Sequence, residues 1–250
     1  MKKLLLVLFF TTLCSPSFSQ ELKKPEEIAD IGLFGGYSAN QHIASFSKIE
    51  GTPFCCPKFE SGTGSGFTLG TLIDIHLWNI LLFGIRADYT IHDGILKDTE
   101  KIFLSDTKSG QSVSGEMTHT IDSKISTFGG QLIFGINLFA DLKLFLGGRA
   151  GYIITKTFTT KSEITKPSNF PLRYDTLISG DIPNTAFALF SLLGGLSYDI
   201  PLNPKKTMSL TPYLNIQFGL NNISTNLTWK TNSFIAGLAL KYHIIEGDFF

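Results

Sequence analysis

The residues with the most distinctive chemistry are two adjacent cysteines, Cys55 and Cys56, which stand between Pro53 and Pro57. Adjacent Cα atoms lie about 3.8 Å apart, closer than the ~4.4–6.8 Å of an ordinary disulfide. A vicinal bridge would therefore be strained, although the two prolines restrict the backbone that must hold it. The sequence favours a vicinal disulfide, with free or intermolecular thiols as the first alternative.

Metal binding is the second alternative for these cysteines, because His42 lies nearby. Two cysteines and one histidine at this spacing match no recognised zinc pattern. We therefore expect no metal site. The sequence also predicts no cofactor-binding residue and no catalytic residue.

A second group of chemically distinctive residues consists of charges that recur at every other position. Asp74 and His76 alternate with apolar residues between Phe67 and Leu77, as Arg86 and Asp88 do between Leu81 and Ile91. Side chains of a strand alternate between its two faces, so a charged face opposite a charge-free face needs two environments. Lipid outside and a polar lumen inside would supply them.

Eight segments carry this alternation and predict an all-β fold, an eight-stranded antiparallel up-and-down transmembrane barrel. Their approximate bounds are 30–40, 67–77, 81–91, 126–138, 142–154, 190–200, 208–220 and 234–244. The outward parity carries no charge. The inward parity holds four acids and four bases: Asp30, Asp74, Asp88, Asp199, Arg86, Lys143, Arg149 and Lys241. His76 and His243 share that parity.

A narrow barrel is just wide enough for side chains to fill it, so its interior charges must pair. We predict a lumen charge network built from Asp74, His76, Arg86, Asp88, Arg149 and Lys241. The alternative is a soluble barrel with its apolar face inside, because parity alone does not say which face is the interior.

The connections alternate between short turns and long polar stretches, the latter near 41–63, 92–124, 155–186 and 221–233. Short periplasmic turns and long extracellular loops are typical of outer-membrane barrels. Within the second long stretch, 95–106 and 117–124 could extend the barrel strands as a hairpin. Pro212 cannot donate to a strand ladder, so we expect a bulge or local widening there.

The two ends of the chain fit this placement. Residues 1–19 have the positive start, apolar core and small-x-small site of a signal peptide, leaving 20–250 as the barrel domain. The chain ends in Phe249-Phe250, like the terminal aromatic that the barrel-insertion machinery recognises. Lys+Arg and Asp+Glu both number 21, which gives no reason to expect a nucleic-acid partner.

The stretch from Asn40 to Phe46, the Gly51-x-Pro53-x-Cys55-Cys56-Pro57-x-Phe59 segment and Gly62-x-Gly64-x-Gly66 carry a family resemblance. They resemble the first-loop region of the small OmpA-like and PorT-like outer-membrane barrels of Gram-negative bacteria. The resemblance implies location in the cell outer membrane, with outer-membrane lipid and lipopolysaccharide as surroundings.

These observations predict a structural or surface-interaction protein with a plugged polar lumen and long extracellular loops. Three alternatives stay open: a rim-located lipid-modifying or hydrolytic enzyme, a small pore, and a soluble lipocalin-like binder. His42, His92 and His119 lie in or beside the long stretches, where a serine or aspartate could complete a catalytic site. Their spacing is not diagnostic, so we expect no enzyme.

Overall fold

The computed structural model describes residues 27–52, 57–77, 80–105, 112–139, 141–167 and 176–245. Eight antiparallel strands close into a ring in the order β1, β2, β3, β5, β6, β8, β10 and β11, and β11 pairs back onto β1. The predicted all-β, eight-stranded up-and-down barrel is confirmed. Among the described residues, no helix is long and apolar enough to cross a membrane.

The strands of the ring correspond to the eight predicted segments but are mostly longer. Their bounds are β1 Glu27–Phe46, β2 Phe59–His76, β3 Leu81–Ile91, β5 Ser112–Phe139, β6 Leu142–Lys166, β8 Ala188–Tyr198, β10 Met208–Gly219 and β11 Thr228–Ile245. The remaining strands are β4 Gly94–Ser105, β7 Thr176–Asp181 and the short β9 Ile200–Pro201. The signal-peptide prediction falls on residues 1–19, which lie outside the described residues.

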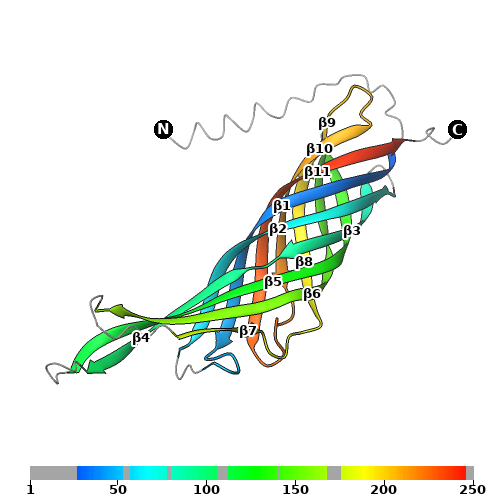
Figure 1. The fold of residues 1–250 in the computed structure, drawn as a ribbon. Coiled ribbons are helices and arrows are strands. Elements are labelled where there is room, and N and C mark those ends of the chain that lie inside the picture. The colour runs from blue at the N-terminus through cyan, green and yellow to red at the C-terminus, as the bar shows by residue number, and fades with distance from the viewer. Residues whose placement is uncertain are drawn as a thin grey trace, which may run out of the picture.

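Beyond the barrel, four strand segments form a twisted sheet, which we call the ribbon: β4, residues 112–125 of β5, residues 156–166 of β6, and β7. Figure 1 shows the ribbon projecting from one end of the barrel, opposite the end where β9 lies. The hairpin anticipated within residues 92–124 is present as β4 and β5. The interpretation of 155–186 as a loop was wrong, because β6 runs on to Lys166 and β7 pairs with it.

The opposite end of the barrel, which we call the short-turn mouth, holds the start of β1 and the end of β11, where Glu27 pairs with Ile245. Pro212 lies near this end with its pairing partly interrupted. Its register with Leu238 on β11 is regular, whereas on the other side β10 pairs with β9 up to Leu210 and with β8 from Tyr213. The expected irregularity is therefore a gap in one ladder.

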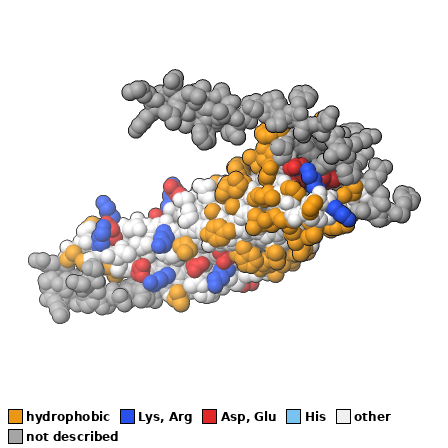
Figure 2. All heavy atoms as spheres, turned by 90° about the horizontal axis from the view of Figure 1, so that it is seen from above, with side chains coloured by type: hydrophobic (Ala, Val, Ile, Leu, Met, Phe, Trp, Pro, Cys, Tyr) orange, Lys and Arg blue, Asp and Glu red, His pale blue; other side chains and the backbone are white. Residues whose placement is uncertain are grey.

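Large apolar side chains cover the outside of the barrel, and Leu33, Leu69, Leu132 and Leu146 are each more than half exposed. One outward aromatic residue on each barrel strand contributes to a belt of aromatic side chains around the ribbon end of this surface, which we call the aromatic ring: Tyr37, Phe67, Tyr89, Phe128, Tyr152, Phe190, Phe218 and Phe234. Neighbouring members stand directly opposite each other or two residues apart. Figure 2 shows hydrophobic side chains gathered on the barrel and charged ones on the ribbon.

The interior changes character along the barrel. Towards the ribbon, beyond the aromatic ring, a buried apolar cluster fills the inside: Ala44, Phe46, Ile49, Phe59, Leu96, Ile121, Ile125, Phe158, Ile182, Ile223 and Trp229. We call it the upper core. Between the ring and the short-turn mouth, two smaller apolar clusters separate groups of buried charges.

Candidate functional site

The charges nearest the short-turn mouth form one connected group, which we call the mouth cluster. Asp30 Oδ2 lies 3.4 Å from Lys143 Nζ and 3.7 Å from Lys241 Nζ. Lys143 also contacts Asp199 at 2.7 Å, and Lys241 contacts Asp74 at 3.0 Å. All five residues are at most 7% exposed, so each charge needs the partners that its neighbours provide.

Strand register determines these contacts. Asp30 on β1 stands opposite Asp74 on β2 and opposite His243 on β11. Two acids at directly opposite positions repel each other, and Lys241, which contacts both, offsets this repulsion. Removing that lysine would leave Asp30 with Lys143 and Asp74 with Arg86, and no cation in contact with both acids.

A second feature of the mouth cluster is an uninterrupted serine–histidine–aspartate chain. The Nδ1 atom of His243 lies 2.7 Å from Asp30 Oδ1, and its Nε2 atom lies 2.9 Å from Ser209 Oγ. Ser209 and His243 line a pocket of about 310 Å³ at the mouth. Asn137, Lys143 and Lys206 line the same pocket, together with the apolar residues Ile80, Leu138, Phe139 and Pro201.

Further into the barrel, Arg86 links the mouth cluster to an apolar layer. Its guanidinium carbon lies 5.2 Å from the ring centre of Phe145 and 5.8 Å from that of Phe34. One guanidinium nitrogen approaches Asp74 Oδ2 at 3.7 Å. Aromatic faces stabilise a desolvated cation, which suits an arginine at this depth.

Beyond this layer, Asp88 and Arg149 form a compact ion pair. Arg149 Nε donates to both carboxylate oxygens of Asp88, at 3.0 and 3.1 Å, and the Nη2 atom of Arg149 donates to Asp88 Oδ1 and, at 2.8 Å, to Thr127 Oγ1. Gln131 and Thr90 donate to the same carboxylate at 2.8 and 2.9 Å. The pair is thus both neutralised and hydrogen-bonded, as a buried pair requires.

His42 joins the polar lumen to the upper core. Trp229 Nε1 donates to His42 Nδ1 at 3.0 Å, so Nδ1 carries no proton and Nε2 faces the carbonyl oxygen of Asp93 at 3.3 Å. His92, which follows β3, is buried beside Thr127 and Ser233, with 3.4 Å between ring nitrogen and hydroxyl in each case. Burial lowers the pKa of His92 to about 3, and the nearby Arg149 charge acts in the same direction.

His119 lies on the ribbon and forms another chain of serine, histidine and acid. Its Nδ1 atom is 2.9 Å from Ser162 Oγ and its Nε2 atom is 3.0 Å from Glu100 Oε1. The three residues come from neighbouring strands, β6, β5 and β4. None of them lines any of the five main pockets in the described part of the chain.

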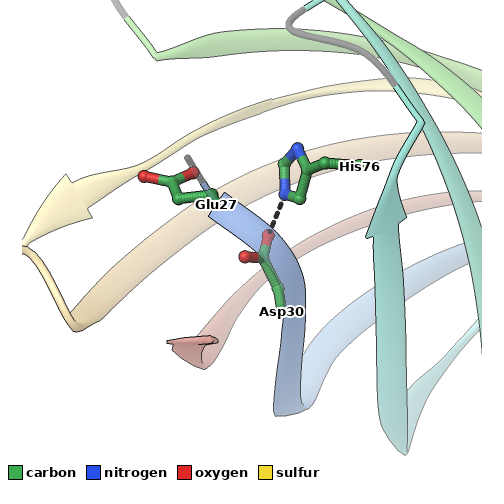
Figure 3. A group of neighbouring side chains, drawn as sticks. All are labelled: Glu27, Asp30 and His76. Atoms are coloured by element: carbon green, nitrogen blue, oxygen red, sulfur yellow. Dashed lines mark ion pairs between the residues drawn. The ribbon is translucent and has the colours of Figure 1, made fainter. Parts of the chain in front are cut away.

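Three potential metal ligands also meet at the mouth. Figure 3 shows Asp30 and His76 directed towards each other, with His76 Nε2 3.2 Å from Asp30 Oδ2, and a carboxylate oxygen of Glu27 lies within 4.8 Å of both. The same aspartate oxygen faces Lys143 and Lys241. Two ammonium groups so close to a shared ligand atom repel a divalent cation, so these residues fit an ion-pair network better than a metal site. Cys55 and Cys56 lie outside the described residues.

Sequence reasoning placed His76, Arg86, Asp88 and Lys241 on the inward face, and the structure gives each of them an acidic or basic contact there. It missed Ser209, which has no charge to mark it. The only sequence signal was its inward parity on the strand next to that of His243, and this signal is shared by every inward serine.

No family model matches the chain, and no curated protein matches it. Solved structures do match. Neisserial surface protein A is 13% identical, with 86% of this chain and 97% of that chain covered and a TM-score of 0.37. The attachment invasion locus protein Ail of Yersinia pestis is 10% identical, covering 87% and 100%, with a TM-score of 0.38.

The outer membrane protein OprG of Pseudomonas aeruginosa is 14% identical, covering 88% of this chain and 99% of that chain, with a TM-score of 0.35. Such values indicate a shared fold type at most.

Proposed function

We propose that this protein spans the outer membrane of a Gram-negative bacterium, keeps its lumen closed, and presents the ribbon at the cell surface to a binding partner. The observation that carries the proposal is the apolar outer surface bounded by an aromatic ring, with charges confined to the inside. Lipid-facing apolar bands flanked by aromatic residues are characteristic of outer-membrane barrels. A soluble lipocalin-like barrel would place this surface inside.

A closed lumen is supported by what fills it. The cavity between Phe34, Arg86, Phe145 and Tyr213 has a volume of about 10 Å³, which is roughly one water molecule. Above it, the Asp88–Arg149 pair and the upper core occupy the interior in turn. Each layer interrupts a water path, which argues against the small-pore alternative.

The ribbon supports a role at the surface. Its register places exposed charged side chains, Lys97 and Lys101 on β4 and Lys161 on β6, on one face of the sheet well beyond the aromatic ring. Phe103 and Leu177 are 85% and 67% exposed there. Charged and apolar side chains thus face the surroundings together on the ribbon, so the partner we favour is a surface protein or the lipopolysaccharide around the barrel.

Topology is tested first, by labelling intact cells with a membrane-impermeant maleimide. In a background where Cys55 and Cys56 are serine, Lys101→Cys on the ribbon should be labelled and Lys205→Cys at the short-turn mouth should not. Both should be labelled after the cells are lysed. Labelling of Lys205→Cys alone in intact cells would reverse the orientation, and failure of the protein to fractionate with the outer membrane would refute the proposal.

Conduction is tested separately, with the purified folded protein in planar bilayers. We expect no stepwise conductance, because the charge layers and apolar layers fill the lumen. Steady channel openings would refute the closed lumen and support the pore alternative. Folding is checked in the same samples by the different gel migration of boiled and unboiled barrel.

A further inference from the structure

We propose that Ser209, His243 and Asp30 form a nucleophilic serine site, which hydrolyses carboxylic esters in the pocket at the short-turn mouth. This inference is independent of the surface role of the ribbon, since it concerns the other end of the barrel. It also departs from the expectation, drawn from sequence alone, that the chain is not an enzyme.

The three residues have the connectivity that a serine nucleophile needs. His243 Nδ1 lies 2.7 Å from the Asp30 carboxylate, so this nitrogen carries the proton and donates a hydrogen bond to Oδ1. His243 Nε2 is then free to accept, and Ser209 Oγ donates to it at 2.9 Å. This is the tautomer and orientation in which histidine acts as the general base of a serine hydrolase.

Three neighbouring strands hold this geometry without any loop. Asp30 and His243 stand directly opposite each other on β1 and β11. Ser209 on β10 is paired with Lys241, two residues from His243 on the same face of β11. Asp30 is also held by Lys143 and Lys241, which fixes its carboxylate; we therefore regard it as a positioning residue.

The adjoining pocket defines the substrate class. Its volume of about 310 Å³ is at the lower end of the range for small-ligand sites. One wall is apolar, formed by Leu138, Phe139 and Pro201, and suits a short acyl chain. Lys143 and Asn137 line the same pocket, and cationic and amide side chains are the kinds that stabilise an ester oxyanion. Ser209 itself is 1% exposed, so the pocket is its route to substrate.

The reaction uses only ester and water. Ser209 Oγ forms a bond to the carbonyl carbon while its proton passes to His243 Nε2. The tetrahedral adduct then breaks its bond to the alkoxy oxygen, which leaves as an alcohol after taking that proton. Water, deprotonated by His243, attacks the acyl-serine, and collapse of the second adduct returns the proton to Ser209 and releases the carboxylic acid.

A second group of serine, histidine and acid in the chain provides an internal control for the assignment of Ser209. Ser162, His119 and Glu100 on the ribbon have a similar set of contacts, but they do not line the mouth pocket or any of the other four main pockets of the described residues. In this ribbon group the acid contacts Nε2 of the histidine and the serine contacts Nδ1, which is the reverse of the arrangement at the mouth. We therefore expect Ser209 to react and Ser162 to remain unmodified.

The first experiment treats the folded wild-type protein with a fluorophosphonate probe and maps the modified residue by peptide mass spectrometry. This readout needs no variant, so it does not depend on whether a mutant folds. We expect modification of Ser209, and none in protein unfolded before the probe is added. Absence of modification, equal modification of the unfolded chain, or modification of Ser162 in place of Ser209 would each overturn the proposal.

The second experiment measures hydrolysis of p-nitrophenyl butyrate by variants that retain the folded gel migration. Ser209→Ala should abolish hydrolysis, His243→Gln should reduce it by about 100-fold or more, and Ser162→Ala should leave it unchanged. Asp30→Asn should lower kcat with KM unchanged, because Asp30 orients the base and does not contact the ester. Wild-type rates in Ser209→Ala would refute the assignment even if Ser209 were labelled.

Discussion

On one side of the aromatic ring the barrel has an apolar outer surface and a polar interior, and on the other side this arrangement is reversed. Towards the short-turn mouth the outer surface is apolar, with Leu69 60% exposed, while buried charges such as Asp74 and Lys241 face inward. Towards the ribbon the interior is the upper core, with Ile121 and Trp229 fully buried, while lysines face outward. The same strands, β1, β2, β5, β6 and β11, run through both regions.

This inversion shows that the surrounding solvent, rather than the strand, decides which face is apolar. Lipid accepts apolar side chains outside and leaves polar ones to pair inside, whereas water favours the usual apolar interior. The aromatic ring lies at the boundary between these two regions, and amphipathic aromatic side chains suit a membrane–water interface.

The largest effect is expected from breaking the Asp88–Arg149 pair within the lumen. Arg149→Met leaves the Asp88 carboxylate buried without a countercharge and should lower the free energy of unfolding by about 3–5 kcal/mol. Adding Asp88→Asn removes the unpaired charge and keeps one of the two oxygens that accept from Thr90 and Gln131, so it should recover much of this loss. Denaturant titration in lipid vesicles measures all three proteins. Additive losses would mean that water solvates the lumen charges.

The next effect compares one outward face of β2 on the two sides of the ring. Leu69→Arg places a charge in the apolar outer surface and should cost about 2–4 kcal/mol. Ser61→Arg on the same face of the same strand is the matched control, because it lies on the ribbon side, and it should cost little. The measurement is again unfolding in vesicles. Similar costs for the two arginines would remove the basis for placing lipid around the barrel.

Alternation in sequence was sufficient to predict the barrel because β1, β3 and β11 keep one parity throughout their length and β2 keeps one from Ser61 onward. It failed on β6, where Arg149 and Ile153 face inward at odd positions but Phe158 and Thr160 do so at even positions. The cause is a bulge: Ser126 and Thr127 of β5 pair with Thr155 and Ile153, so Ile154 is an extra residue. Such a bulge shifts the face of all later residues, and nothing in the local sequence announces it.

The candidate site was less predictable than the fold for a related reason. Parity places Asp30, His243 and Ser209 on the inner face, but only the register between β10, β11 and β1 decides that their side chains touch. Register depends on closure of the whole ring. A one-strand pattern therefore predicts a polar lumen and cannot predict a particular triad.

A smaller effect is the pH dependence contributed by His92. Its pKa is lowered to about 3 by burial, whereas the unfolded chain titrates near about 6.5. The unfolded state thus binds a proton that the folded state does not, so the stability present above about pH 6.5 falls as the pH drops towards 3. The slope for one such group is about 1.4 kcal/mol per pH unit.

His92→Gln should remove this slope, because glutamine still reaches the hydroxyl groups of Thr127 and Ser233 and does not titrate. Unfolding free energies measured from pH 7 to pH 4 test it, and values between pH 7 and 8 serve as the baseline in which His92 stays neutral in both states. An unchanged acid slope in the variant would show that water reaches His92 in the folded protein.

The smallest effect is also the most direct test of the inversion, because the same substitution is made in both regions. Ile121 is fully buried in the upper core, and Ile85 is 48% exposed on the apolar outer surface. Ile121→Val removes a methyl group from a packed interior that closes only partly, which should cost about 0.5–1.5 kcal/mol. Ile85→Val removes the same group where fluid lipid chains fill the space, so its cost in vesicles should be smaller. Equal losses would mean that Ile85 is packed against protein and would place the solvent boundary elsewhere on the barrel.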